Sequence, residues 1–223
     1  MPLANNILSQ ISEVTADLIS CGLSSDQNFP SMSEEDNCNF LTFAGENDLS
    51  ITLKNVYYVD LYAELKARRQ FNVQLIDGAL LQMQYILRGD EVKKHRLAFF
   101  PAPDLAEYQN NPDIYETDEI YADILSKNIV TSPIRFDFDR DNFKDEVHPM
   151  SHMTIGQYKN CRIAVGGPLT PYVFIHFILK SFYNTALNVH SKNIRAHNYD
   201  FDQTITEAER NSIHIMTPPN AKR

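Results

Sequence analysis

The sequence comprises 223 residues, of which 43% are hydrophobic and 22% are charged, a composition typical of soluble globular proteins. A formal net charge of −9 argues against non-specific binding of nucleic acid over the whole surface. Three cysteines without a CxxC pair disfavour both a disulfide framework and a metal cluster. Because no apolar run approaches the about 20 residues that span a bilayer, and no signal-peptide pattern opens the sequence, we expect a cytoplasmic protein without a membrane partner.

The first predicted element is an amphipathic helix over residues 3–20. Apolar residues recur there at three- and four-residue steps, and Gly22 is a natural C-terminal cap. The segment 24–39 is polar and contains Pro30, so it is predicted to be a loop.

Strands and a second helix are predicted next. Residues 40–45 and 50–55 have the composition of two short strands, and residues 58–70 have helical spacing. Residues 73–87 and 92–100 read as longer strands joined by the turn sequence RGDE. The sequence therefore predicts hairpins through its first half.

The second half contains one strongly predicted helix. Residues 171–187 are apolar on nearly every side, with Thr170 as the N-cap and Pro171 as the first helical residue. Such a helix is expected to be buried across a sheet. A shorter helix is predicted over 117–127 and a final strand over 212–218.

These elements predict an α+β fold in which an antiparallel sheet is built from hairpins and helices pack mainly on one face. We expect a single domain over 1–223, comprising an N-terminal helix (3–20), a sheet core (about 39–165), a core helix (171–187) and a C-terminal strand or tail (188–223).

Ionisable side chains alternate with apolar ones in three segments, RFDFD (135–139), SHMTI (151–155) and CRIAV (161–165). Successive side chains of a strand point to opposite faces, and a one-residue slip would expose the apolar set. If the apolar sides face the helix 171–187, the polar side chains share the opposite face. They are Arg135, Asp137, Asp139, His152, Thr154 and Arg162, with His148 held beside them by Pro149.

This polar face has two interpretations of about equal weight. It can be a solvated surface on which opposite charges pair across strands. It can also be a site for acid–base catalysis on a phosphodiester. In that site, His152 and His148 transfer protons, Asp137 orients His152, and Arg135 is a further catalytic residue that holds the phosphate. Arg162, Asp139 and Thr154 are the candidates for substrate binding.

A divalent metal is the competing chemistry, with ligands from His148, His152, Asp137 and Asp139. In a continuous strand, however, residues four apart lie about 13 Å apart, too far for both imidazoles to bind one ion. We therefore rank a metal cofactor below metal-free catalysis.

The segment 134–183 carries an R-F-D run, an H-P-x-S-H element and a P-x-x-F-I-x-F-I-L-x-x-F-Y helix. With the hairpin GALLQMQYIL…KKHRLAFFPAP, it resembles a bacterial family defined only as a domain of unknown function. The aromatic–acid strand before an HPxxH element is also similar to TumE-type toxins. That second resemblance implies a nucleic-acid-cleaving toxin or phage-defence effector, with Arg135, Asp137, His148 and His152 as the matched residues.

Two hypotheses follow for function. The first is a bacterial toxin- or defence-type nuclease that acts on a nucleic-acid substrate. The second is a non-catalytic subunit of a defence or toxin–antitoxin complex, which recognises a protein partner from the same operon. The acidic charge and the aromatic-rich composition fit this second hypothesis equally well.

Overall fold

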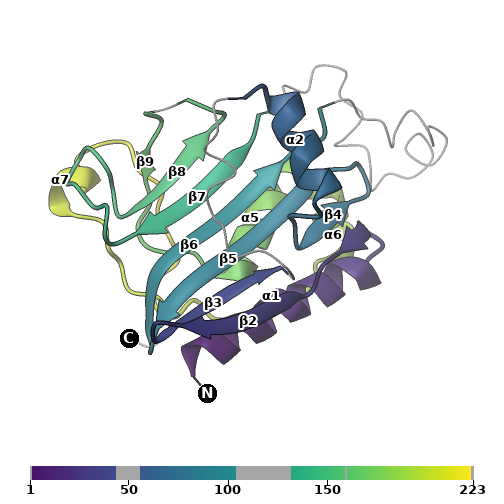
Figure 1. Cartoon of the computed structure of the whole chain (residues 1–223), viewed down its shortest axis with the longest axis horizontal. Coiled ribbons are helices and arrows are strands. Elements are labelled where there is room, and N and C mark those ends of the chain that lie inside the picture. Colours follow the sequence, from purple (N-terminus) through teal and green to yellow (C-terminus); the bar gives the residue numbers. More distant parts are fainter. Residues whose placement is uncertain (1, 44–55, 104–131, 159, 222–223) are drawn as a thin grey trace.

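The computed structural model describes residues 2–43, 56–103, 132–158 and 160–221. Within these residues the predicted α+β fold with an antiparallel sheet is confirmed (Figure 1). The strands are β1 (Ser24–Gln27), β2 (Pro30–Glu35), β3 (Cys38–Phe43), β4 (Val73–Leu75), β5 (Leu80–Arg88), β6 (Glu91–Phe100), β7 (Ile134–Asp139), β8 (Ser151–Ile155) and β9 (Ile163–Ala164). The helices are α1 (Leu3–Ser20), α2 (Tyr58–Ala67), α5 (Pro171–Phe182), α6 (Asn184–His190) and α7 (Glu207–Arg210).

All strand pairs are antiparallel, and the main path through the sheet is β1-β4-β5-β6-β7-β8-β9. The hairpin β2–β3 joins β5 through β3. The single strand predicted over 73–87 is wrong, because a turn at residues 76–79 divides it into β4 and β5, which pair with each other. The predicted hairpin with residues 92–100 is present as β5–β6, and Gly89 has a positive φ of 57° in its two-residue turn. Glycine adopts this conformation without the strain that a Cβ would add.

The prediction of a loop over 24–39 is wrong, because this segment contains β1 and β2. Pro30 begins β2, where its missing N–H can be tolerated at the edge of a sheet. Asp36 and Asn37 both have positive φ between the paired residues Glu35 and Cys38, as a two-residue hairpin turn requires. Strand β2 is exposed over most of its length, so its sequence lacks an apolar alternation.

Two other predicted elements lie outside the described residues: the strand 50–55 and the helix 117–127. The predicted helices over 3–20 and 58–70 are present as α1 and α2. After α1, Gly22 has a φ of 70°, and the N–H of Leu23 donates to the carbonyl of Leu18, so the expected glycine cap is confirmed.

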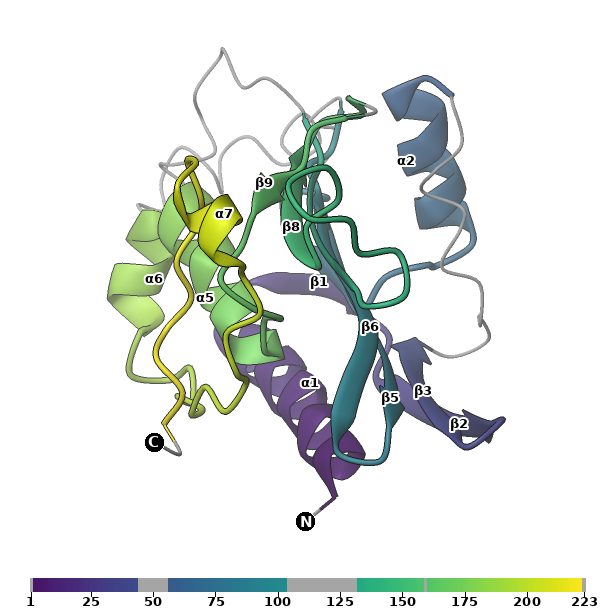
Figure 2. The same cartoon turned by 90° about the vertical axis from the view of Figure 1, so that its left-hand side faces the viewer.

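The helices lie on two faces of the sheet. Helices α1, α5 and α6 lie on one face, and α2 lies on the other (Figure 2). The main core fills the space under α1 and α5, where the ring of Phe136 makes edge contacts with Phe174 and Phe177. A smaller core lies beneath α2, where Leu61 and Leu65 belong to one cluster with Phe100 and its neighbours. The residues of β6 therefore face apolar surroundings on both sides near the C-terminal end of that strand.

The predicted core helix 171–187 is interrupted. Helix α5 starts as expected, with the Thr170 side chain accepting from the N–H of Val173, but it ends at Phe182. Tyr183 has a non-helical backbone, and its hydroxyl donates to the buried carboxyl of Asp77 at 2.7 Å before α6 begins. Because the helix is interrupted at Tyr183, the ring of this residue packs into the main core.

The prediction of a final strand over 212–218 is also wrong. Only Ile215 forms an isolated parallel bridge, with Val165, and the preceding residues contain the short helix α7. The C-terminal segment is attached through Gly166, whose N–H donates to Ile215 at 2.8 Å and whose carbonyl accepts from Thr204.

Charged contacts fasten the C-terminal segment to α1. The backbone N–H of Arg195 donates to Asp17 at 2.9 Å, and its guanidinium donates to the same carboxylate at 2.7 Å.

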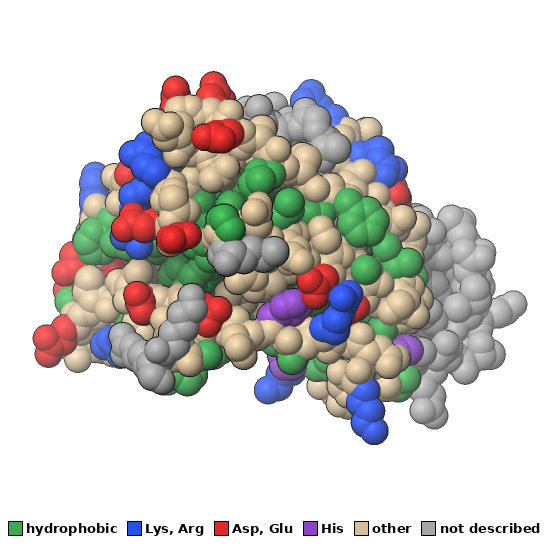
Figure 3. All heavy atoms as spheres, turned by 90° about the horizontal axis from the view of Figure 1, so that it is seen from below, with side chains coloured by type: hydrophobic (Ala, Val, Ile, Leu, Met, Phe, Trp, Pro, Cys, Tyr) green, Lys and Arg blue, Asp and Glu red, His purple; other side chains and the backbone are tan. Residues whose placement is uncertain are grey.

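On the face seen from below in Figure 3, acidic and basic side chains lie close to histidine side chains. None of the described helices is both long and apolar enough to span a membrane.

Candidate functional site

A cavity of about 650 Å³ lies on the face of the sheet opposite α5. All seven polar residues singled out from the sequence line it: Arg135, Asp137, Asp139, His148, His152, Thr154 and Arg162. The apolar residues that alternate with them, such as Phe136 and Phe138, belong to the core on the other face. The alternation of the strands therefore gathers these polar side chains, as the sequence predicts.

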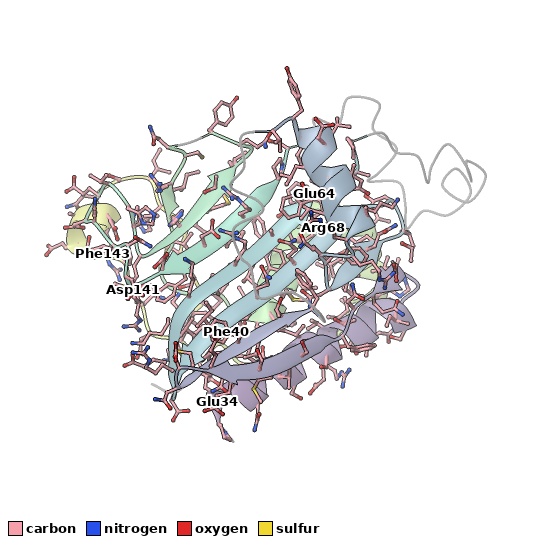
Figure 4. The ribbon with its side chains drawn as sticks, viewed as in Figure 1. Glu34, Phe40, Glu64, Arg68, Asp141 and Phe143 are labelled. Atoms are coloured by element: carbon pink, nitrogen blue, oxygen red, sulfur yellow. The ribbon has the colours of Figure 1, made fainter. Side chains whose placement is uncertain are left out.

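The cavity lies between α2 and the loop that follows β7. Leu61 of α2 lines one end, and Asn142 of the loop lines the other. Figure 4 marks these two sides, with Glu64 and Arg68 on α2 and Asp141 and Phe143 on the loop. The strands between them form the floor.

The register of the sheet arranges the floor in rows. Asp137 lies opposite Arg96 on one side and opposite His152 on the other. Two residues along β7 in one direction, Arg135 is opposite Thr154. Two residues along β7 in the other direction, Asp139 is opposite Lys94. Directly opposed residues have Cβ atoms about 5 Å apart, so each row is a set of contacting side chains.

A buried ion pair lies in the central row. Arg96 donates from Nε to Asp137 at 3.0 Å, and the two side chains are 7% and 16% exposed. Burial alone would raise the pKa of Asp137, but the charges of Arg96 and Arg135 outweigh burial and hold that pKa below its ordinary value. Asp137 is therefore a carboxylate at neutral pH, adjacent to His152.

The cations Lys94 and Arg96 were missed by the sequence reasoning, which placed only β7, β8 and β9 in the site. A signal was available in the run KKHRLAFF, where Lys94 and Arg96 alternate with the buried residues His95 and Leu97. Pairing of β6 with β7 brings this alternation into the same face.

Asp139 has a structural role at the margin of the cavity. Lys94 contacts its carboxylate at 2.9 Å, and Asn142 donates to it from the side chain at 2.9 Å. The backbone N–H groups of Asp141 and Asn142 also donate to it. This carboxylate is thus engaged in holding the loop after β7, and its assignment to substrate binding stays a prediction.

His148 and His152 are in contact. Their ring centroids are 4.9 Å apart and nearly perpendicular. The expected separation of about 13 Å is wrong because only His152 belongs to β8, whereas His148 ends a turn in which its N–H donates to Lys144 at 2.7 Å. The chain bends at Met150, directly after Pro149, and the two rings come together.

A hydrogen bond sets the tautomer of His152. Its Nδ1 lies 3.0 Å from the carbonyl oxygen of Pro149, which can only accept, so Nδ1 carries a proton and Nε2 of the neutral ring has the free lone pair. Burial lowers the pKa of His152, and the nearby charge of Asp137 opposes this effect without cancelling it. Burial and the charge of Arg162 lower the pKa of His148 as well.

The described residues that line the cavity carry an excess of positive charge. Among them are four cationic side chains (Lys94, Arg96, Arg135 and Arg162) and two carboxylates (Asp137 and Asp139). The Nη1 atom of Arg135 is buried and has no hydrogen-bond partner among the described residues. Burial also lowers the pKa of Arg135, because a buried guanidinium is less well solvated than an exposed one. Two unbalanced cations in a chain of net charge −9 make this cavity suited to an anion.

The two imidazoles are close enough to share a metal ion, which removes the distance argument against such a site. Among the described residues, however, no group of three or more His, Cys, Asp or Glu side chains is arranged to hold an ion. Asp137 is instead paired with Arg96, and Asp139 with Lys94.

A family model described as an uncharacterised conserved protein, DUF2290, matches residues 23–217. The chain belongs to this family. The resemblance to a domain family of unknown function is thereby confirmed, and the DUF2290 region contains every described strand and every described residue that lines the cavity. Helix α1 lies before this region. No curated protein and no solved structure gave a significant match to the chain.

Proposed function

We propose that this DUF2290 protein is a nuclease that cleaves phosphodiester bonds in the cavity by general acid–base chemistry. The observation that carries the proposal is the contact between two imidazoles inside a cavity with an excess of cations. Cleavage of a phosphodiester uses a base, an acid and positive charge for the developing negative charge, and two imidazoles among cationic side chains support this proposal.

His152 serves as the general base in this mechanism. Its hydrogen bond to the carbonyl of Pro149 leaves Nε2 as the proton acceptor, and its lowered pKa keeps the ring neutral at pH 7. The carboxylate of Asp137 lies opposite His152 and stabilises the imidazolium that forms when the base takes a proton.

His148 serves as the general acid. Two imidazoles in contact disfavour double protonation, because each charge lowers the pKa of the other ring. An anionic substrate favours the binding of one proton by the two histidines. The protonated ring, His148, then acts as the acid, and the neutral ring, His152, acts as the base. Arg135 and Arg162 hold the phosphate, and Arg135 has a buried Nη1 donor without a partner among the described residues.

For the biological setting, we propose a bacterial toxin or phage-defence effector that acts in the cytoplasm. Its support is the short likeness of the aromatic–acid strand and the HPxxH element to TumE-type toxins. A protein partner encoded in the same operon is part of this proposal, and its support is the acidic charge and aromatic-rich composition of the chain.

The proposal is tested by incubating purified protein with RNA and DNA oligonucleotides, with and without a chelator. We expect cleavage that falls about 10²- to 10⁴-fold in His152→Ala, the range for loss of a general acid or base. Arg135→Ala is expected to weaken cleavage through loss of phosphate binding.

Two variants outside the cavity serve as controls. His214→Ala removes an imidazole from the C-terminal segment, and Arg68→Ala removes an exposed guanidinium paired with Glu64 on α2. Both are expected to cleave at the rate of the unaltered protein. Cleavage that persists in His152→Ala and Arg135→Ala would remove the cavity from the mechanism. A protein that cuts no oligonucleotide but retains a stoichiometric partner would instead be a non-catalytic subunit.

A further inference from the structure

We infer that the substrate of this cavity is single-stranded RNA, and that the 2′-hydroxyl of the RNA is the nucleophile. The inference rests on the proposed phosphodiester cleavage and adds the substrate class. Three features carry it: the base nitrogen of His152, the depth of the floor, and an exposed aromatic ring among the lining residues.

For Nε2 of His152 to act as a base, the hydroxyl that it deprotonates must lie next to the bound phosphate. Thr154 is two residues from His152 on the same face of β8, and it lies opposite Arg135 on β7. A phosphate held by Arg135 thus lies close to both the imidazole and a hydroxyl that can hydrogen-bond a sugar. In RNA the 2′-hydroxyl and the 3′-phosphate are on adjacent carbons of one ribose, so a bound phosphate brings its nucleophile with it.

The reaction needs no other reactant. Nε2 of His152 takes the proton of the 2′-hydroxyl, the 2′-oxygen forms a bond to phosphorus, and the bond from phosphorus to the 5′-oxygen breaks. The leaving 5′-oxygen receives the proton carried by His148. The products are a 2′,3′-cyclic phosphate and a 5′-hydroxyl end, and exchange of one proton with water restores the pair.

The depth of the floor indicates an unpaired strand. His152 is 5% exposed and Thr154 is 4% exposed, so a scissile phosphate must enter the cavity to reach them. Bases of a single strand can be splayed apart to allow this entry, whereas a duplex keeps its sugars and phosphates on a regular helical surface.

Tyr158 offers a platform for such an unpaired base. Its side chain is 75% exposed and lines the cavity together with Gln157, whose Nε2 donates to the backbone carbonyl of Val56 at 3.0 Å. Stacking of a base on an aromatic ring contributes about 1–3 kcal/mol, largely independent of base identity. We therefore expect Tyr158 to bind a nucleotide next to the scissile bond.

The substrate class is tested with four oligonucleotides of one sequence: all RNA, all DNA, DNA with a single ribonucleotide, and RNA with 2′-O-methyl groups. We expect cleavage of the all-RNA strand and, in the chimera, only on the 3′ side of its ribonucleotide, with a 2′,3′-cyclic phosphate detected by mass spectrometry. Annealing of the RNA to a complement is expected to abolish cleavage.

The other outcomes of this experiment distinguish a failure of the RNA inference from a failure of the proposed nuclease function. Cleavage of the all-DNA or the 2′-O-methyl strand at the rate of RNA would overturn the inference and leave the proposed nuclease intact. Equal cleavage of the annealed RNA would overturn the requirement for a single strand. If none of the four is cleaved, both the inference and the proposed function fall.

Tyr158 is tested separately. Tyr158→Ala is expected to raise KM for the RNA about 5- to 150-fold with a smaller effect on kcat, as loss of one stacked base implies. Tyr158→Phe retains the ring and is expected to match the unaltered protein. An unchanged KM in Tyr158→Ala would contradict the stacking role.

Discussion

At the residue scale, the ionisation of the two cavity histidines depends on their neighbours. Burial is the largest cause of the lowered pKa of both rings, and Asp137 opposes it at each of them. Arg162 acts in the same direction as burial at both rings. The charge of Arg162 thus favours the neutral form of both imidazoles.

Replacement of Arg162 by Gln tests this dependence. Loss of the cation removes a charge that disfavours imidazolium, so the pKa values of His148 and His152 are expected to rise. The measurement is a titration of the imidazole C–H signals by NMR, with His148→Ala and His152→Ala used for assignment. His214, outside the cavity, is the internal control. If the pKa values of His148 and His152 do not rise in the variant, the electrostatic account is contradicted.

The residues of the site were largely predictable because alternation in a strand fixes sidedness. Arg135, Asp137, His152 and Thr154 share one face for the reason the sequence suggests. The close approach of His148 to His152 was not predictable, because it depends on the turn that ends at His148 and the bend at Met150 rather than on strand spacing.

At the scale of elements, the sequence predicts the helices and strands that bury a continuous apolar face. Helix α1 and the β5–β6 hairpin have such faces. Strand β2 does not, since its residues are mostly exposed and its pairing with β3 is specified by the turn at Asp36 and Asn37. The predicted final strand failed for a different reason, because residues 212–218 make one bridge only, at Ile215.

The connection between β9 and α5 has a specific requirement for glycine. A Cβ on Gly167 would lie 2.7 Å from the backbone oxygen of Asp202 and 3.0 Å from the hydroxyl of Tyr199. The backbone oxygen cannot move without shifting the C-terminal segment, so Gly167→Ala is expected to cost about 1–3 kcal/mol of unfolding free energy. Urea denaturation measures this loss, and a variant as stable as the unaltered protein would show that the segment is not packed there.

At the scale of the whole molecule, stability is linked to pH through buried histidine. His95 lies in the core between the rings of Tyr85 and Phe138, and its Nε2 accepts from the N–H of Leu169 at 3.0 Å. Burial is the main cause that lowers its pKa from 6.5 to about 4. The imidazole of His95 is therefore neutral in the folded state, and the same imidazole binds a proton more tightly in the unfolded chain.

The sign of the effect follows from this difference. The contribution of His95 is fully present above pH 6.5 and is lost as the pH falls toward 4, because the unfolded state then binds more protons. A shift of this size corresponds to about 3 kcal/mol. His148 and His152, whose pKa values are also lowered, add to the loss in the same direction.

His95→Gln removes this titration and retains an acceptor for Leu169. We expect the variant to be less stable than the unaltered protein at pH 7 and the gap between them to narrow toward pH 4. Denaturant unfolding at a series of pH values measures the gap. A gap that stays constant with pH would show that His95 does not contribute to the acid sensitivity.

The central claim is that a phosphodiester binds in the cavity formed by β6, β7 and β8. The most direct measurement is an NMR titration of the histidine side chains with a 2′-O-methyl RNA dinucleotide, which has a phosphate but no nucleophile. We predict that the signals of His148 and His152 shift and that their pKa values rise on binding, while His214 is unaffected. Saturable binding that leaves both cavity histidines unchanged would contradict the account.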